Sequence, residues 1–410
     1  MARPSITVEI GFMTTPTFGD GFVLDSTTQG RLNSSTYLLG GPEWTDVTNY
    51  TSECTIERGR SRQLDQFDAG TCSLVLRNES RRFDPTNASG PYYGGIAIRN
   101  PVRITVNSSL AFYGFVEDYG VEFSGPRVSQ ATVSASDAFS LLAQSQIAAR
   151  TPNAEKSGSR IRWVLSRSEV RFPAEHTGTI NNGSATLGNF AISEGTNTLD
   201  YLQSIADAER GRLYMQKDGT LRFRGRTNVP SLTAASFTDT AGGIPYQDIS
   251  YEYGSEQFYN YVSIANAAAS PTAQTAEDSA SIMAYGMRGL NKTGMLLSSN
   301  AQCLSMATAL LGQYGQPEFR VSAITVNLDR LTSTQQNTIL GLEISDLITV
   351  QLTPPGGGSA ILKVARIEGI SHARSVNTHD LALQLSTING SPLVLGDATF
   401  GLAGTGTLAY

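Results

Sequence analysis

Charge, lysine and cysteine are all scarce in this sequence. Charged residues make up 16% of the 410 residues, against about 25% in an average soluble domain, and only Lys156, Lys217, Lys292 and Lys363 are lysines. The net charge of −6 argues against a dedicated nucleic-acid-binding protein, which is usually basic. Because a freely solvated enzyme surface normally carries more charge, this scarcity predicts a surface that is committed to contacts.

Long hydrophobic runs are also absent. No stretch approaches the roughly 20 apolar residues of a membrane-spanning helix, and no apolar segment follows the first arginine as it would in a secretory signal. We therefore expect no membrane anchor. Three cysteines cannot build a disulfide framework. Whether Cys54 and Cys72 pair across a predicted hairpin stays open, and buried, reduced thiols are the simplest expectation.

Residue patterns that carry chemistry are missing as well. The three histidines, His176, His372 and His379, lie on predicted loops and turns, and no His or Cys cluster has the spacing of metal ligands. No nucleophile elbow, phosphate-binding loop, dinucleotide fingerprint or EF-hand loop occurs. Carboxylates are plentiful, but no pair stands out as acid and base. The sequence thus predicts no catalytic, cofactor-binding or metal-binding residue, and no enzymatic activity.

What the chain has in abundance is β-strand pattern. Its 40 glycines and many Thr and Ser residues separate alternating runs such as TSECTIERG, TCSLVLRN and ATVSAS. Strands at this spacing predict a first β-barrel domain over residues 43–149. Alternating runs return later and predict a second β-barrel domain over 246–389, which includes a helix at 298–314.

Between the two β regions, residues 150–245 show a mixed pattern. Apolar residues at helical spacing begin at Leu199, after a capping Asn or Thr. An Asp218-Gly219 pair between two alternating runs then predicts a β-hairpin. These signals indicate an α+β insert.

The two ends of the chain are rich in Gly and Thr. Residues 1–42 and 390–410 are predicted to be extended arms, and the segment 22–36 resembles the segment 392–407. The predicted fold class is therefore mainly β with an α+β insert, with two β-barrel, tube-like domains per chain and extended terminal arms.

An internal repeat joins the two β regions. PVRITV at 101–106 resembles SDLITVQL at 345–352, and a hairpin with an acidic residue on its return strand, Glu117 or Glu368, follows each. Both copies then continue into an alternating strand, ATVSAS or LALQLS. Generic β-patterning could produce this likeness, but the preserved order favours two copies of one barrel.

Arginines cluster in the first β region. Arg58, Arg60 and Arg62 alternate with other residues in a predicted loop, and Arg81 and Arg82 follow shortly after. Arginine makes bidentate contacts and is enriched at protein interfaces. Because acidic residues are interleaved with them, phosphate binding is the weaker interpretation. We predict these five residues as possible inter-subunit contacts, with a solvated loop as the alternative.

Several segments together resemble one family. The pieces DVTNY, RGRSRQLDQFDAGT and LRNESRRFDPTNASGPYYG, within 46–104, resemble the N-terminal barrel of siphophage tail hub (minor tail) proteins, from bacteriophages with long, non-contractile tails. TLDYLQSIADAERGRLYMQKDGTLRFRGR resembles the insert of that family, and SIMAYGMRGL with LLGQYGQPEFRVSAITVNL resembles its second half. The resemblance covers about residues 40–390, in the right order.

This resemblance implies a structural tail hub. In that family, two tube-like barrel domains per chain form a homotrimer with pseudo-sixfold symmetry, which closes the sixfold tail tube. The implied partners are the distal tail protein, the tape measure protein and tail fibre or central fibre proteins, with viral DNA only in transit. The implied location is the distal end of the phage tail in the virion, after assembly in the bacterial host cytoplasm.

Other functions stay open beside the hub. A hexameric distal tail adaptor protein is expected to carry one barrel per chain, so two barrels favour the hub. A peptidoglycan-degrading tail protein would need an acid/base pair or a zinc site. A receptor-binding tail protein could stack sugars on tyrosines of YEYGSEQFYNY, although strand packing is the commoner reason for such a stretch.

Overall fold

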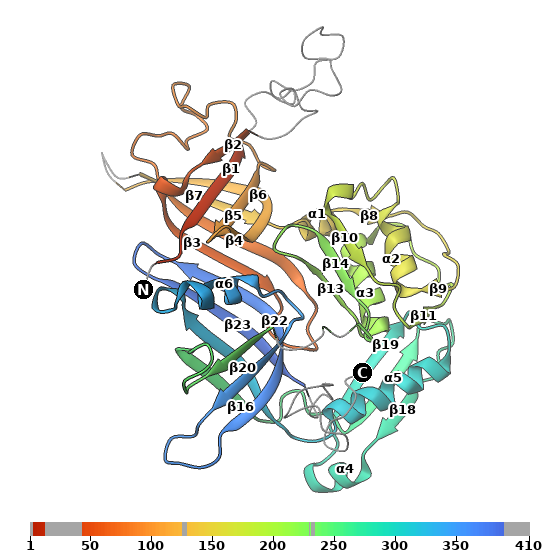
Figure 1. Cartoon of the computed structure of the whole chain (residues 1–410). Helices are drawn as coiled ribbons and strands as arrows, with labels where there is room; N and C mark the ends of the chain where they lie inside the picture. The colour runs from red at the N-terminus through yellow and green to blue at the C-terminus, as the bar shows by residue number, and fades with distance from the viewer. Residues whose placement is uncertain (1–2, 13–42, 125–128, 229, 231–233, 389–410) are drawn as a thin grey trace.

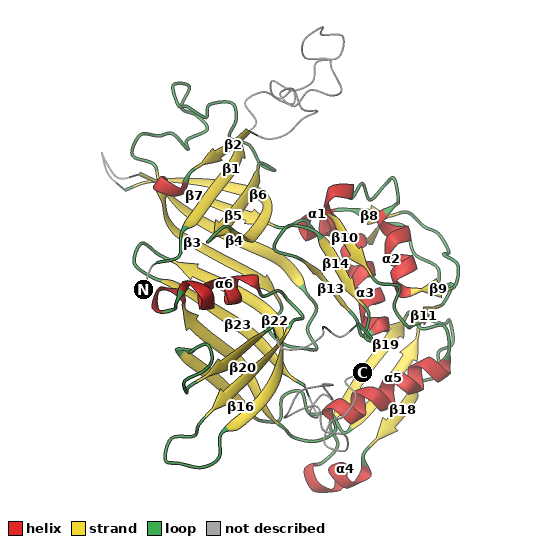
Figure 2. Ribbon diagram, in the orientation of Figure 1, coloured by secondary structure: helices red, strands yellow, loops and turns green. Residues whose placement is uncertain are grey.

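The computed structural model describes residues 3–12, 43–124, 129–228, 230 and 234–388 (Figure 1). A large sheet extends along one side of the molecule, and two smaller α+β units lie beside it (Figure 2). The chain is mainly β, as the sequence predicts.

The first half of the large sheet, here called the first β lobe, comes from the N-terminal third of the chain. Its strands are β1 (Ile6–Phe12), β2 (Glu43–Asp46), β3 (Thr51–Gly59), β4 (Asp68–Arg77), β5 (Pro101–Val106), β6 (Ser109–Phe123) and β7 (Ser129–Ser136), with a 3-10 turn η1 at Thr48–Tyr50. Sequence alternation becomes alternation of burial, since Cys72, Leu74 and Leu76 of β4 face the core.

One strand of this lobe comes from a segment that the sequence pattern assigns to an arm. Residues 6–12 form β1, which pairs with β5 and buries Val8 and Ile10. The remainder of the predicted N-terminal arm, 13–42, lies outside the described residues, as does the predicted C-terminal arm.

The second β lobe is built from the C-terminal part of the chain. It contains β15 (Ala235–Thr238), β16 (Asp248–Tyr253), β20 (Phe319–Asn327), β21 (Leu347–Leu352), β22 (Ile361–Arg374) and β23 (His379–Thr387). A 3-10 turn η3 (Leu328–Arg330) and helix α6 (Ser333–Gly341) follow β20, and Thr332 starts α6 with a capping box. β15 pairs in parallel with β21, so the lobe includes a strand from the range predicted as insert.

The two lobes form one continuous sheet. Among the described residues it has 13 strands, in the order β16-β20-β23-β22-β3-β4-β7-β6-β5-β1-β2, with β21 joining β22 to β15. The described strands do not close into a barrel, and the two-barrel arrangement stays a prediction. The lobes meet where β22 pairs with β3.

The first α+β unit corresponds to the predicted insert. It contains the short strands β8 (Gln146–Ile147), β9 (Glu155–Lys156), β10 (Thr177–Ile180), β11 (Thr186–Leu187), β12 (Thr196–Asn197), β13 (Arg212–Met215) and β14 (Leu221–Arg224), helices α1 (Phe139–Gln144), α2 (Ser157–Leu165) and α3 (Thr198–Glu209), and a 3-10 turn η2 (Ala174–His176). The predicted helix and hairpin are confirmed, because Asn197 caps α3 and Gly219 turns between β13 and β14 with φ +79°.

The second α+β unit differs from the sequence-based expectation. Strands β17 (Tyr261–Asn266), β18 (Gln274–Glu277) and β19 (Gly289–Met295) form their own sheet, accompanied by helices α4 (Ser279–Tyr285) and α5 (Asn300–Tyr314). Helix α5, predicted within the second barrel, packs on β17 and β18 instead. Its apolar stripe, which includes Cys303, Met306 and Leu310, is buried there.

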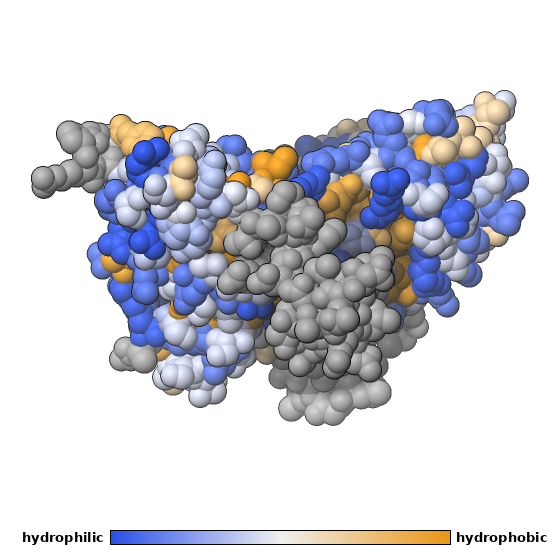
Figure 3. Space-filling model, turned by 90° about the horizontal axis from the view of Figure 1, so that it is seen from above, coloured by the Kyte–Doolittle hydropathy of each residue, from blue (hydrophilic) through white to orange (hydrophobic). Residues whose placement is uncertain are grey.

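The outer surface of the view in Figure 3 is mostly hydrophilic, and its hydrophobic patches gather toward the middle, between the two halves of the molecule. No helix in the described part of the chain is long and apolar enough to span a membrane.

Candidate functional site: two open strand edges

The internal repeat predicted from sequence is present in three dimensions. Strands β5, β6 and β7 follow one another as an antiparallel meander, and β21, β22 and β23 do the same. Each copy has a register shift at its glutamate, between Val116 and Asp118 on β6 and between Ile367 and Gly369 on β22. The two meanders therefore match residue for residue around Glu117 and Glu368.

A hydrogen bond is repeated with the strands. The Ser136 hydroxyl of β7 donates to Glu117 at 2.7 Å, and the Ser386 hydroxyl of β23 donates to Glu368 at 2.5 Å. Both serines end the alternating strands ATVSAS and LALQLS. A shared bulge, acid and serine donor are too specific for generic β-patterning, so the two lobes are copies of one unit.

The repeat extends further than the sequence comparison predicted. β4 pairs with β7 as β20 pairs with β23, and β3 pairs with β4 as β16 pairs with β20. This equivalence of strand pairings aligns ECTIERG at 53–59 with DISYEYG at 248–254. The two segments share an acid, a Ser or Thr, a Glu and a Gly at equal positions. β16 is thus the second copy of β3, and this short match was the signal that could have found it.

One edge-to-edge junction is closed inside the chain. The outer half of β22 pairs antiparallel with β3, from Gly369 opposite Gly59 to Arg374 opposite Cys54. Side chains on one face of this junction are buried, including Ile56 at 1% exposure and Ile370 at 4%, whereas Thr55, Glu57 and Ala373 on the other face are exposed. The lobes are thereby joined at this seam by continuous strand pairing from residue 54 to 59, with a buried face toward the core.

Gly59 fits the seam because it has no side chain. Its φ is +100°, and a Cβ there would lie 2.3 Å from the Glu368 carbonyl oxygen. Gly369 is similarly crowded, since a Cβ at that position would lie 2.8 Å from the Arg60 carbonyl oxygen. The two backbones approach too closely for larger residues.

Ion pairs reinforce the same junction. Arg60, directly after β3, donates from Nε to Glu368 at 2.8 Å, and Arg212 lies 3.6 Å from that carboxylate. Burial acts to raise the pKa of Glu368, but the charges of Arg60, Arg212 and Arg366 outweigh it and lower that pKa to about 2. The carboxylate is therefore ionised and held between cations from both lobes and the insert.

The second copies of these two edges have no strand partner among the described residues. Residues 118–123 of β6 correspond to the part of β22 that binds β3, yet pair only with β7. β16 corresponds to β3, yet pairs only with β20. Phe123 and Tyr253 on these edges are 59% and 68% exposed, and a Cβ on Gly254 would meet nothing within 4 Å. Among the described residues, the first lobe therefore has an unpaired strand edge on β6 that corresponds to β22, and the second lobe has one on β16 that corresponds to β3.

The five predicted contact arginines fall into two groups. The side chains of Arg58 and Arg60 are largely buried, and Arg58 lies on β3 and not in the predicted loop. Arg58 pairs with Glu343 at 2.9 Å, and Arg60 pairs with Glu368. Arg62 pairs with Glu256 at 2.8 Å and Arg81 with Asp84 at 2.7 Å, and both arginine side chains are about half exposed. Arg82 stacks over the Tyr50 ring at 4.0 Å. A role between subunits stays a prediction for all five.

The cysteines and histidines form no site in the described part of the chain. All three cysteines are free and buried, and burial raises the pKa of the Cys72 thiol. His372 and His379 face one another across the β22–β23 turn, with Nδ1 and Nε2 3.1 Å apart. No group of three or more His, Cys, Asp or Glu side chains in that part could hold a metal ion.

Comparison with known proteins gives a fold match. No family model and no curated protein matches the sequence. The crystal structure of the tail protein from Neisseria meningitidis MC58 is similar over 94% of this chain and 97% of its own, with a TM-score of 0.62 and 13% identity. This chain has the fold of that tail protein. The 43 kDa tail protein of prophage MuSo2 from Shewanella oneidensis shares the tail-protein fold over 93% and 98%, with a TM-score of 0.59 and 13% identity.

The tail-protein fold also occurs within a larger assembly. The PdpA–VgrG complex from Francisella matches 94% of this chain but 53% of the compared chain, with a TM-score of 0.52 and 10% identity. At such identities the likeness concerns the backbone arrangement, and the open edges have to be interpreted from this chain's own residues.

Proposed function

We propose that this protein is a structural tail hub of a long-tailed bacteriophage, which assembles into a ring through its two open strand edges. The observation that carries this proposal is the internal repeat, which contains one closed β3–β22 junction and leaves the equivalent edges of β6 and β16 open. A head-to-tail contact between copies reproduces the closed junction between chains.

The closed junction supplies a register for the contact. Superposing the repeat places Tyr119 opposite Tyr253, Val121 opposite Tyr251 and Phe123 opposite Ile249 of a second copy. All three are apolar or aromatic pairs, which are favourable across strands. Asp118 stands where the junction has Gly369, so the pairing is expected to begin at Tyr119, one residue beyond the crowded position.

The proposed number of copies rests on the proposed partner, the sixfold tail tube. A sixfold tail tube presents six equivalent faces, and three chains with two lobes each present six similar ones. We therefore propose a homotrimer with pseudo-sixfold symmetry. A hexameric distal tail adaptor is the weaker alternative, because a hexamer of this chain would present twelve lobes.

The proposed location is the distal end of the tail in the virion. There the hub contacts the distal tail protein, the tape measure protein and tail fibre proteins, and DNA passes through the ring. This role is structural and not enzymatic. Clearing of a peptidoglycan zymogram by the purified protein would contradict that part of the proposal and favour a cell-wall-degrading tail protein.

The ring is tested by measuring the oligomer of the purified protein. Native mass spectrometry and negative-stain images at about 10 μM are expected to show a trimer with a central pore. Phe123→Lys and Tyr253→Lys place a charge in the proposed contact and are expected to yield folded monomers, with far-UV circular dichroism spectra like that of the wild type. Since both side chains are exposed, neither substitution disturbs the core.

Met283→Lys is the matched control. Met283 is 88% exposed on α4, which belongs to neither open edge, so this variant is expected to remain a trimer. A wild-type monomer, or a trimer that both edge variants leave intact, contradicts the proposed contact. A hexamer supports the adaptor alternative.

A further inference from the structure

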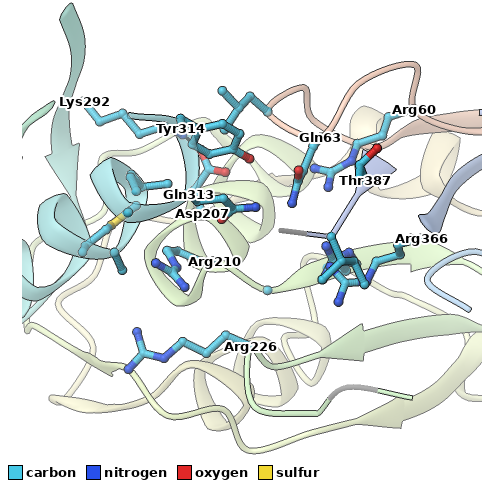
Figure 4. A pocket seen from close by; sticks show the side chains of 18 residues that line it. Arg60, Gln63, Asp207, Arg210, Arg226, Lys292, Gln313, Tyr314, Arg366 and Thr387 are labelled. Carbon is cyan, nitrogen blue, oxygen red and sulfur yellow. Dashed lines mark hydrogen bonds and ion pairs between the residues drawn. The ribbon is translucent and has the colours of Figure 1, made fainter. Parts of the chain in front are cut away.

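A cavity of about 360 Å³ lies where the second β lobe meets both α+β units. Its wall is unusually rich in positive charge. Arginines line it from the loop after β3, from β22, from the end of α3 and from the segment after β14, and Figure 4 labels one from each: Arg60, Arg366, Arg210 and Arg226. The cationic side chains in the wall are Arg60, Arg210, Arg212, Arg226, Arg366 and Lys292.

Few carboxylates balance these charges. Asp207 is the only one in the wall formed by the described residues, and it lies 3.4 Å from Lys292. Glu368 lies behind the wall, paired with Arg60 and Arg212. Glu209 is next to Arg210 in sequence, but its carboxylate accepts hydrogen bonds from the backbone of Ser184 and Ala185. Positive charge is therefore in excess around the cavity, although the whole chain is acidic.

Several guanidinium nitrogens lack a hydrogen-bond acceptor among the described residues. Nη1 of Arg210 and Nε of Arg212 and Arg366 are buried and have no hydrogen-bond partner among the described residues. The Arg226 side chain makes no ion pair with those residues either, and its backbone N–H alone bonds to Glu209. Buried donors without acceptors are costly, and native proteins usually satisfy them with protein, water or ligand atoms.

Electrostatics point the same way. Burial, with the repulsion of Arg212 second, lowers the pKa of Arg366 to about 9. Burial also lowers the pKa of Arg210, with repulsion from Arg226 next in size. A bound anion stabilises guanidinium groups that are held close together in this way. It offsets their mutual repulsion and accepts hydrogen bonds from donors that have no other partner.

We propose that this cavity is a binding site for a multivalent oxyanion of the phosphate class. Guanidinium forks match the geometry of phosphate oxygens, and each can form two parallel hydrogen bonds. These forks come from four separate places: Arg210 at the end of α3, Arg212 on β13, Arg226 after β14 and Arg366 on β22. An anion with two linked phosphate groups can therefore contact more of them than a single phosphate can.

The experiment is calorimetric titration of the full chain with pyrophosphate, at low ionic strength. Saturable binding of one pyrophosphate per chain is expected, with orthophosphate weaker and chloride without effect. The double variant Arg210→Gln/Arg226→Gln removes two cations from the wall, and we expect it to weaken pyrophosphate binding at least about 10-fold. Arg330→Gln, an exposed arginine outside the cavity, is the matched control and leaves binding unchanged.

A third variant tests the charge argument in the opposite direction. Asp207→Asn removes the wall's carboxylate and is expected to strengthen pyrophosphate binding several-fold, a gain that misfolding cannot mimic. No heat of binding in wild-type protein means that water or the chain itself satisfies the arginines, which overturns the proposal. Binding that the double variant leaves unchanged overturns it too, because the anion then binds elsewhere.

Discussion

Gly59 offers a sharp test of the junction, because the repeat supplies its own control. Replacing Gly59 with alanine forces a residue that has a Cβ to adopt a backbone φ of +100°. It also puts that Cβ 2.3 Å from the Glu368 carbonyl oxygen of β22. The backbone strain costs about 1–3 kcal/mol, and displacing β22 adds about 1–3 kcal/mol, as overpacking does elsewhere. We expect Gly59→Ala to lower the free energy of unfolding by about 2–6 kcal/mol.

Gly254→Ala is the same substitution at the equivalent position of the other copy. Gly254 does not have a positive φ, and its Cβ would meet nothing within 4 Å, so the unfolding free energy is expected to change by less than about 0.5 kcal/mol. Urea unfolding followed by far-UV circular dichroism measures both values, with equal m-values as a check. If the two variants prove equally stable, the inferred crowding at the seam is incorrect.

Two further predictions concern buried charge. Glu368→Gln removes the carboxylate on which Arg60 and Arg212 converge, and should cost about 3–5 kcal/mol of unfolding free energy in urea titrations, because buried cations lose their partner; a loss below about 1 kcal/mol would show that water replaces it. Burial lowers the pKa of His379 to about 4 and that of His372 well below 6.5. The unfolded chain thus binds more protons between pH 6.5 and 4, and stability should fall as pH drops through this window. In the His379→Gln variant, the urea midpoint should decrease less steeply as the pH falls from 6.5 to 4. An unchanged pH dependence would mean that other groups cause the loss of stability.

Local elements were predictable from the sequence because their signals are local. The α3 helix has its cap at Asn197 and its apolar stripe within a few residues, and the β13–β14 hairpin has its Asp-Gly turn. The repeat around Glu117 and Glu368 was also visible, since ITV and the following acid recur in order. These features need only the spacing of residues along the chain.

Sheet membership was not predictable in the same way. The stretch from 246 to 266 has one continuous strand pattern, yet β16 joins the large sheet and β17 a separate one. Helix α5 has an apolar stripe that any sheet face could cover, and the structure places it on β17 and β18. Alternation tells which side of a strand is buried, but it carries no information on which neighbour pairs with it.

The arginines show the same division. Sequence alone established that positive charge in this protein is mostly arginine, and that Arg58, Arg60 and Arg62 alternate along a short segment. Only the tertiary structure decided that Arg60 meets Glu368, 308 residues away, while Arg210 and Arg226 are left facing a cavity. Composition and periodicity are properties of the chain, whereas charge pairing and open edges depend on long-range strand pairing, which no local pattern encodes.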